Sequence, residues 1–299
     1  MCGILATINI ETSSKKFLKA LRLMEHRGPD NTSYINHNNH YFGHTRLSIL
    51  DLSDRSNQPF ISGDYLIIYN GEVYNYQELI KEHDLNMDTT SDTEVVLKMY
   101  MKYGVKALDY FNGMFAFIIF NTKSKDVFVA RDRLGIKPLY YRKLNDGFIF
   151  SSEIASILEM FNDDFDEFGI RQYKKLRMTL KGHTFYKNTK MFPAGHYFLN
   201  GQIHKYWELN YSPKDPISDE ELKWLIEDSV KIRRRSDVPV GSYLSGGLDS
   251  TILSYILDPD HTWTVGFDDL NEFEWSQLAA DNLHGRHHKT VVNAEFTEE

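Results

Sequence analysis

The pattern of apolar residues changes near residue 220 of the 299-residue chain. Before this point, short β-branched and aromatic runs are separated by turn residues, and helical patterns are few. Beyond it, a helix predicted over 220–235 is followed by strands at 240–244, 262–267 and 288–292, which alternate with helices at 249–257 and 274–283. Strands separated by turns favour stacked antiparallel sheets, whereas strands alternating with helices favour a parallel sheet. The chain is therefore expected to hold an α+β unit followed by an α/β unit.

A polar stretch marks the boundary between these units. Residues 210–219 include Pro213 and Pro216 and are typical of a linker. We therefore predict a first domain over 1–209 and a second domain over 220–299. Within the first domain the patterns predict strands at 3–10, 41–49, 65–69, 114–120, 127–130, 139–141 and 148–150, helices at 15–25 and 95–103, and a closing hairpin within 183–207. The helix at 95–103 is expected to start with a capping box, in which Ser91 and Glu94 satisfy each other's free amides.

Composition excludes several classes of protein. The net charge of -8 argues against a sequence-independent grip on nucleic-acid phosphates. No apolar run reaches the roughly 18 residues of a membrane-spanning helix, and the run at 2–10 leads into polar residues rather than a signal-peptide pattern. The single cysteine excludes an intramolecular disulfide and argues against a cysteine-based zinc site. These properties predict a cytoplasmic protein with no nucleic-acid partner, no membrane partner and no metal site of its own.

Cys2 directly follows the initiator methionine, so removal of Met1 would place a thiol and a free α-amino group on one residue. The thiolate is the nucleophilic form of cysteine, and an amine held beside it can act as its base. The ordinary pKa of an α-amino group is only about 8, which suits that task. Position alone leaves a second interpretation open, because free cysteine is also among the most buried residue types.

Cys2 belongs to a series of short segments over the first 140 residues. They are 1–4 (MCGI), 26–30 (HRGPD), 44–49 (HTRLSI), 70–75 (NGEVYN), 91–94 (SDTE), 113–117 (GMFAF) and 131–140 (RDRLGIKPLY). In this order and spacing the series resembles the class II glutamine amidotransferases, which use an N-terminal cysteine as nucleophile. The resemblance implies the N-terminal-nucleophile fold, a four-layer αββα sandwich, and it implies that Cys2 is the nucleophile.

The resemblance also implies how glutamine would be bound. Arg46 would bind its α-carboxylate bidentately, the alternative being an ordinary surface arginine. Asp92 would pair with its α-ammonium, a role compatible with favouring the helix dipole. Asn70 and Gly71 would form the oxyanion hole, although an Asn-Gly pair is otherwise the commonest two-residue hairpin signal. Backbone contacts would come from the remaining residues of the implied site, Leu47, Ser48, Ile49, Leu50 and Glu72.

The second unit contains a loop that suits phosphate, Ser245-Gly246-Gly247-Leu248-Asp249-Ser250, between a predicted strand and a predicted helix. Glycines let the backbone approach an oxyanion, and a helix N-terminus presents free amides to phosphate. The loop is neither a Walker A motif nor a dinucleotide fingerprint. It resembles the pyrophosphate-binding loop of ATP pyrophosphatases, which implies an adenine nucleotide α-hydrolase-like domain. By this resemblance the loop would hold the phosphates of ATP, and Leu244 and Val265 would flank the adenine.

The combination of both units resembles the glutamine-hydrolysing asparagine synthetases. The implied reaction hydrolyses glutamine at Cys2 without a cofactor and uses the ammonia, with ATP and Mg²⁺, to amidate aspartate. Members of that family carry a second acidic, glycine-rich loop for Mg²⁺–pyrophosphate and a later lysine, and neither is found in this sequence. We therefore expect a synthetase domain that is incomplete in this chain, either because a second chain or a homodimer partner completes it or because the sequence is a fragment. The alternative is a stand-alone glutaminase or ammonia-donor subunit whose second domain serves docking or regulation.

Overall fold

The computed structural model describes residues 1–145, 147–212 and 216–293. The chain divides into two compact units, Met1–Tyr211 and Ser212–Glu299, and this division lies within the linker predicted at 210–219. Residues 213–215 of that linker and 294–299 of the predicted second domain lie outside the described residues. Along the described ranges, no helix is both long enough and apolar enough to cross a membrane.

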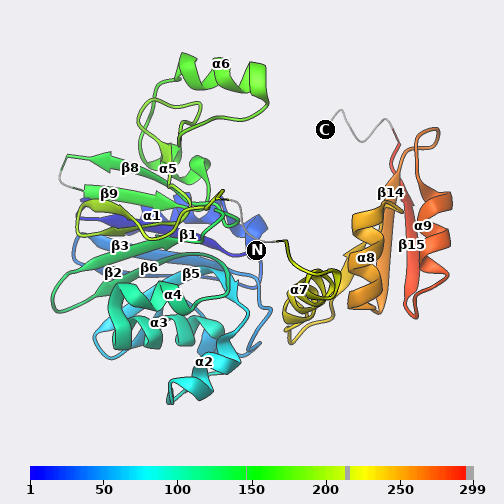
Figure 1. Ribbon diagram of the computed structural model, residues 1–299. Helices are drawn as coiled ribbons and strands as arrows, with labels where there is room; N and C mark the ends of the chain where they lie inside the picture. Colours follow the sequence, from blue (N-terminus) through cyan, green and yellow to red (C-terminus); the bar gives the residue numbers. More distant parts are fainter. Residues whose placement is uncertain (146, 213–215, 294–299) are drawn as a thin grey trace. The chain divides into compact units, whose positions relative to one another are not determined.

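The first unit contains two six-stranded sheets whose pairings are all antiparallel (Figure 1). The first sheet has the order β10 (Lys190–Met191), β8 (Tyr140–Leu144), β9 (Gly147–Ser151), β1 (Gly3–Ile8), β3 (His40–Arg46) and β2 (Asn31–His37). The second has the order β12 (Gln202–Lys205), β11 (His196–Leu199), β7 (Val127–Arg131), β6 (Gly113–Asn121), β5 (Tyr65–Val73) and β4 (Phe60–Ser62). Every strand predicted in the first domain is present, with ends that shift by a few residues.

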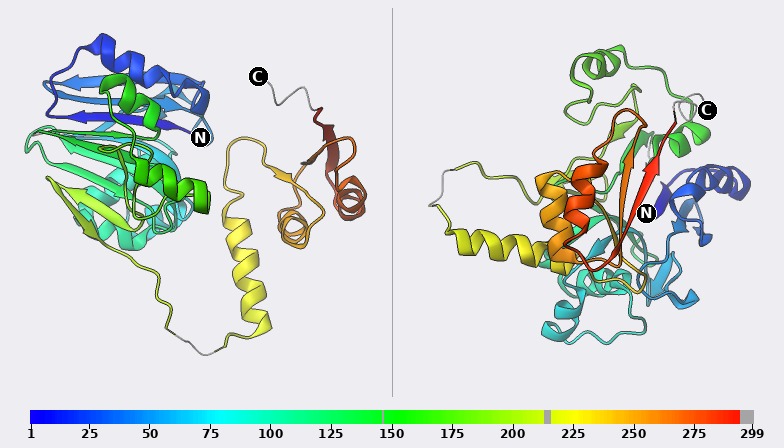
Figure 2. Two further views of the ribbon diagram at one scale, coloured as in Figure 1. Left: turned by 90° about the horizontal axis from the view of Figure 1, so that it is seen from above. Right: turned by 90° about the vertical axis from the view of Figure 1, so that its right-hand side faces the viewer.

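Three apolar clusters separate four layers. The middle cluster lies between the sheets and includes Ile4, Ile68, Ala116 and Phe150. A second cluster joins the outer face of the first sheet to helices α1 (Ser14–Arg22) and α5 (Ile154–Met160). A third joins the second sheet to helices α2 (Tyr76–Glu82), α3 (Asp92–Tyr103) and α4 (Ala107–Tyr110). The helices α1 and α3 accordingly lie on opposite sides of the paired sheets (Figure 2). The predicted four-layer αββα sandwich is confirmed.

Two local predictions in this unit are wrong. Ser91 does cap α3, but its hydroxyl accepts the N–H of Thr93 at 3.2 Å. The Glu94 carboxylate does not return to Ser91; it accepts from the N–H groups of Asp88 at 3.0 Å and Thr89 at 2.7 Å. The amide of Ser91 is satisfied instead by the Thr89 hydroxyl at 3.2 Å. Glu94 therefore fastens the preceding loop, because that loop offers it more donors than one capping amide.

The segment 183–207 is also more divided than the predicted hairpin. The strands β11 and β12 form that hairpin at the edge of the second sheet, but β10 adds to the first sheet. Helix α6 (Glu167–Leu176), which the patterns did not predict, precedes this segment and lies outside the layers (Figure 1). The predicted helix at 15–25 ends at Arg22 and is followed by a short 3₁₀ turn, Glu25–Arg27.

The second unit has the predicted alternation. Strands β13 (Gly241–Tyr243), β14 (His261–Gly266) and β15 (Arg286–Val291) form a parallel sheet in that order. The helices are α7 (Asp219–Ile232), α8 (Leu248–Leu257) and α9 (Phe273–Ala280). The parallel register brings the loop after β13 beside the end of β14, since the carboxyl ends of parallel strands meet at one edge of a sheet.

Candidate active site

Cys2 lies at the start of β1, beside the end of β3. Antiparallel pairing of Gly3 with Thr45 sets this position. The Cys2 sulfur accepts the backbone N–H of Leu47 at 3.4 Å, and it lies 3.7 Å from the Leu47 carbonyl. The thiol is thus held by the chain that leaves β3, in a place where a backbone amide can stabilise negative charge on sulfur.

The segment 26–30 contacts both Cys2 and β3 and so helps to fix their positions. Arg27 donates from Nε to the Cys2 carbonyl at 3.0 Å and from Nη1 to Glu153 at 3.1 Å. Gly28 lies so close to β3 that a Cβ atom there would come 2.3 Å from the Thr45 carbonyl oxygen. Any side chain at position 28 would therefore push β3 away from Cys2.

The end of β5 supplies the groups opposite Cys2. Asn70 and Gly71 lie within the strand and pair with Ala116 and Phe115 of β6, so the alternative of a hairpin turn at this Asn-Gly pair is wrong. Both polar atoms of the Asn70 side chain are buried and have no hydrogen-bond partner among the described residues. A Cβ at Gly71 would come 2.4 Å from the Met114 carbonyl oxygen, which excludes any larger residue. A buried primary amide without partners is costly unless a ligand completes it.

Two carboxyl groups face the same region. Asp92, in the first turn of α3, accepts from the Tyr69 hydroxyl at 2.6 Å and from the Val73 N–H at 2.9 Å. Burial raises the pKa of Asp92 to about 6, against the effect of these donors. Burial, and then the charge of Asp92, raise the pKa of Glu72 to about 7. The Oε1 atom of Glu72 is buried without a partner in the described chain. The pair suits a cationic ligand group, whose charge would favour both ionised forms.

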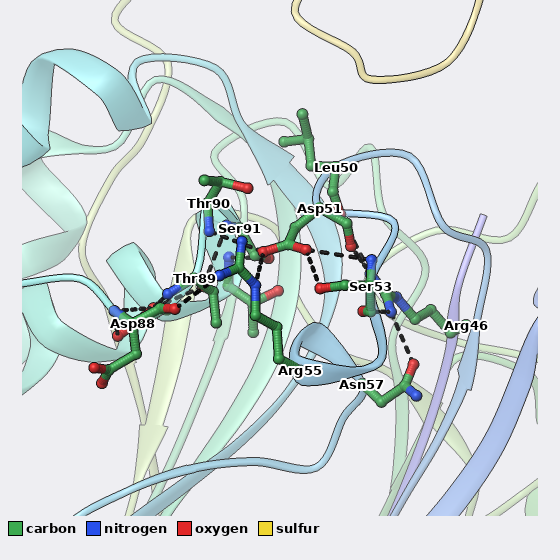
Figure 3. A network of polar contacts seen from close by, with 12 residues as sticks. Arg46, Leu50, Asp51, Ser53, Arg55, Asn57, Asp88, Thr89, Thr90 and Ser91 are labelled. Atoms are coloured by element: carbon green, nitrogen blue, oxygen red, sulfur yellow. Dashed lines mark hydrogen bonds and ion pairs between the residues drawn. The ribbon is translucent and has the colours of Figure 1, made fainter.

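Arg46, at the end of β3, holds the loop that follows it (Figure 3). Its Nη1 atom donates to the Ser53 carbonyl at 2.9 Å and to Asn57 Oδ1 at 2.8 Å. Its Nη2 atom donates to the carbonyls of Leu50 and Asp51. The Asp51 carboxylate then links this loop to the start of α3 by accepting from the Thr90 N–H at 2.9 Å. The guanidinium therefore stabilises the conformation of the loop and also places a positive charge at the site.

These groups surround one cavity of about 230 Å³. Of the residues predicted to bind glutamine or act on it, those that line the cavity are Cys2, Arg46, Leu47, Ile49, Leu50, Asn70, Gly71, Glu72 and Asp92. Ser48 is not among the lining residues; its N–H donates to Asp30 at 2.7 Å. The structure thus brings together, from β1, β3, β5 and α3, nearly the whole set that the sequence predicts.

The lining also includes residues that the sequence did not predict to bind glutamine or act on it. They are Met1, Ser56, Gln58, Tyr69, Ser91, Thr93, Met114 and Lys137. Five of them (Met1, Ser91, Thr93, Met114 and Lys137) belong to the segments that carry the family resemblance, which was the available signal. Ser56, Gln58 and Tyr69 lie outside those segments, and only the folded chain brings them to the cavity.

The titration of Cys2 is governed by opposing effects. Burial raises the pKa of the Cys2 thiol, whereas the Leu47 N–H, the chain's amino terminus and Lys137 act to lower it. Burial lowers the pKa of the His44 imidazole to about 3, which makes it a poor base. The α-amino group that removal of Met1 would create is thus the better candidate base.

The predicted ATP site in the second unit is only partly assembled. Leu244, Ser245 and Val265 line a cavity of about 520 Å³ at the carboxyl ends of the strands, whereas Gly246, Gly247, Leu248, Asp249 and Ser250 do not line it. Gly246 has φ +84, and Gly247 is the N-cap of α8. The Ser245 and Ser250 hydroxyls lie 2.9 Å apart and close the loop over the start of the helix.

The described residues hold no group of three or more His, Cys, Asp or Glu side chains that could bind a metal ion.

Comparison with known proteins agrees with the geometry of both units. The family model of the glutamine amidotransferase domain matches residues 1–208, and that of asparagine synthase matches residues 221–299. The chain is 36% identical to asparagine synthetase [glutamine-hydrolyzing] 1 of Bacillus subtilis, over 90% of this chain and 46% of that protein. It is 33% identical to asparagine synthetase B of Escherichia coli, over 93% of this chain and 48% of that protein. A Methanocaldococcus jannaschii protein whose name assigns the same activity provisionally is 36% identical, over 96% of this chain and 64% of its own length.

The fold has a match among solved structures. The glutamine phosphoribosylpyrophosphate amidotransferase of B. subtilis superposes with a TM-score of 0.52 at 15% identity, over 97% of this chain and 65% of that one. At that identity the likeness concerns the fold alone. The chain spans about half of the length of the two bacterial asparagine synthetases it matches. The chain therefore belongs to the family of proteins with a glutamine amidotransferase domain, which its first unit forms, and its second unit matches the model of the asparagine synthase family.

Proposed function

We propose that the first unit hydrolyses glutamine at Cys2. The Cys2 thiolate would attack the side-chain carbonyl carbon of glutamine, while the freed α-amino group takes the thiol proton and passes it to the leaving ammonia. Water would then hydrolyse the thioester, so that glutamine and water give glutamate and ammonia. Asn70 Nδ2 and the Gly71 N–H would donate to the oxyanion formed in each step.

The observation that carries this proposal is the Asn70 side chain. Its amide is buried, unpartnered in the described chain and part of the cavity that Cys2 lines. Within the same cavity Asp92 and Glu72 would bind the α-ammonium of glutamine, and Arg46 its α-carboxylate. Because Nη1 and Nη2 of Arg46 also donate to carbonyls of the 50–57 loop, binding of the α-carboxylate by Arg46 would depend on the position of that loop.

Replacement of Asn70 tests the oxyanion role. We expect Asn70→Ala to lower kcat for glutamine hydrolysis by about 10²- to 10³-fold with little change in KM. Asn36→Ala, at an exposed position of β2, is the matched control and should retain full activity. An effect of Asn70→Ala on KM alone would remove Asn70 from the oxyanion hole.

Replacement of Cys2 tests the nucleophile. We expect Cys2→Ala to abolish glutaminase activity with an unchanged circular dichroism spectrum. The intact mass of active protein should show that Met1 has been removed. Substantial hydrolysis by Cys2→Ala, or full activity with Met1 retained, would contradict the mechanism.

We further propose that the ammonia serves the ATP-dependent amidation of aspartate, the reaction that the resemblance to asparagine synthetases implies. The supporting features are the loop 245–250 at the N-terminus of α8 and the cavity lined by Leu244 and Val265. Mg²⁺ would accompany ATP as a co-substrate, and a cytoplasmic location would fit these small-molecule partners. Exposed apolar side chains of this unit, such as Trp224, Leu248 and Trp275, support a second chain or a homodimer partner packing against it.

The synthetase proposal is tested with ammonia supplied directly. Because only part of the ATP site is assembled, the 299-residue chain alone is expected to hydrolyse glutamine but to form no asparagine from aspartate and ATP. Pyrophosphate release and asparagine formation are the measurements. Rapid aspartate-dependent turnover by the isolated chain would show that the site is complete, and glutaminase activity that never couples to ATP would favour the ammonia-donor alternative.

A further inference from the structure

Two cationic side chains line the glutaminase cavity, and their bonding differs. Arg46 has four acceptors, all in the loop after β3. Lys137 is only 5% exposed, yet its ammonium has no hydrogen-bond partner among the residues that the structure describes. The side chain lines the cavity, and a positive charge in a poorly solvated cavity is costly unless anions face it. The position of Lys137 therefore calls for a reason.

The backbone at Lys137 is fixed from two directions. Its N–H donates to the buried Asp132 carboxylate at 3.0 Å, and its carbonyl accepts from Arg131 Nε at 2.8 Å. Asp132 also accepts the Ile136 N–H at 2.9 Å, which closes a turn through Gly135 with φ +68. The stem of Lys137 thus starts from a rigid turn and enters the cavity from the side of β7.

The charges around Lys137 come from several elements. The anionic groups that interact with it are Cys2, Glu72 and Asp132, and the cationic one is Arg27. Lys137 in turn acts on the amino group of Met1, on Cys2 and on Glu72. Asp30 and Arg27 also act on the Met1 amino group, and Asp92 acts on Cys2 and Glu72. Burial lowers the pKa of Lys137, and Cys2 and Glu72 oppose this. The Lys137 side chain thus lines the same cavity as the thiol that must become an anion.

We propose that Lys137 is a positioning residue of this site, whose charge stabilises the Cys2 thiolate and keeps the adjacent α-amino group neutral. This inference rests on the proposed glutamine hydrolysis at Cys2. A positive charge in a poorly solvated cavity attracts a thiolate and disfavours a second ammonium. The first effect favours the thiolate, and the second keeps the amine unprotonated and therefore able to accept the thiol proton. Lys137 need not touch glutamine to do this.

The single cysteine makes the test direct, since the rate of alkylation by iodoacetamide reports on Cys2 alone. The rate is measured against pH on the mature chain without glutamine. We expect Lys137→Met to raise the apparent thiol pKa by about one unit or more, which is a tenfold loss of thiolate below that pKa. Lys137→Arg should keep it within about 0.3 unit, because the charge remains. Lys106→Met, at an exposed position, is the control and should titrate like the unaltered chain. An apparent thiol pKa in Lys137→Met equal to that of the unaltered chain would overturn the proposal.

The unaltered chain offers a second measurement if Lys137→Met fails to fold. Electrostatic coupling is reciprocal. Converting the thiol to its neutral carboxamidomethyl form should therefore lower the pKa of Lys137, as followed by NMR of ¹³Cε-labelled lysine. A Lys137 pKa that does not move would reject the coupling. Neither measurement needs turnover, so a shifted thiol pKa in a chain that cannot hydrolyse glutamine would reject the proposed function and not this inference.

Discussion

Glu72 and Asp92 both hold their protons to unusually high pH, and glutamine should compete with those protons. Their pKa values of about 7 and about 6 arise chiefly from burial. An α-ammonium group attracts the ionised forms only. Because the two carboxyl groups also interact, they will titrate as a pair. Binding of an amino acid is thus linked to release of protons from the cavity.

This linkage predicts a pH-dependent KM. As pH falls from 8 to 6, the ionised fraction of a group with pKa near 7 falls roughly tenfold, so the KM for glutamine should rise by roughly that factor. Steady-state kinetics across this range measures it. Glu72→Gln should remove the step near pH 7 and leave the one associated with Asp92. A KM that is constant from pH 8 to 6 would show that neither carboxyl group binds the α-ammonium.

Replacing Arg46 by lysine separates its two functions. A lysine cannot reproduce the planar fork, so we expect Arg46→Lys to raise the KM for glutamine at least about tenfold and to lower the melting temperature. Asn57→Ala is the matched variant, because it removes one loop contact of Arg46 and leaves the cation in place. If both variants raise KM equally, Arg46 acts only by holding the loop.

At the residue scale, most residues of the candidate site could be predicted from the sequence, but the pKa shifts of its titratable groups could not. Cys2, Asn70 and Asp92 were predicted because they stand in recognisable segments. The partners that set their properties, such as Tyr69 on Asp92, come from other parts of the chain. Burial, which dominates the pKa values of Glu72 and Asp92, depends on both sheets being in place. No spacing along the chain encodes it.

At the scale of elements, the start of α3 is tied to the loop before it by Glu94. This side chain is fully buried and pairs with Lys98 at 2.7 Å as well as with the amides of Asp88 and Thr89. Burial alone would raise the pKa of Glu94, but Lys98, Thr89 and Asp88 outweigh it and hold the value below the ordinary one. The carboxylate therefore stabilises the fold above the unfolded-state pKa, and this contribution is lost as pH falls through the folded-state pKa.

We expect Glu94→Gln to lower the free energy of unfolding at pH 7 by about 1.5–3 kcal/mol, the usual range for a hydrogen bond to a charged group. The difference from the unaltered chain should shrink between roughly pH 5 and pH 3, as the carboxylate is protonated in both states. Urea denaturation at the two pH values measures this. Glu82→Gln, at an exposed position of α2, should change little at either pH. A loss that is equal at pH 7 and pH 3 would mean that the charge is not involved.

The elements themselves were largely predictable, because the apolar runs of β5, β6 and β7 are long and continuous. Which strands pair with one another was less predictable. Asn70-Gly71 continues β5 instead of turning, since β6 pairs with that strand over its full length and outweighs the local turn preference. Likewise, nothing local says that β10 joins one sheet while β11 joins the other. Such choices depend on which edge is free, and this is a property of the assembled sheets.

At the scale of the whole molecule, the two units differ in the core that each possesses. The first has three extensive apolar clusters. In the described part of the second, the buried apolar side chains are Val230, Leu244 and Ala280. We therefore expect calorimetry to show two transitions, with the second unit unfolding at the lower temperature.

Saturating glutamate, the product of the proposed hydrolysis, should raise the upper transition and leave the lower one in place, since a ligand stabilises only the unit that binds it. A single transition that shifts as a whole would mean that the two units unfold together.

The proposed nucleophile and the proposed oxyanion donor belong to different sheets: Cys2 leads into β1 of the first, and Asn70 belongs to β5 of the second. Their separation is consequently set by the thickness of the apolar layer between the sheets, in which Ile4, Ile68 and Ala116 pack. Those side chains therefore set the distance between Cys2 and Asn70, although none of them carries a reactive group. In directed evolution of this domain, substitutions that thicken or thin that layer would change the turnover rate, although they lie in the core. The volume of buried apolar side chains would then be under selection for catalysis.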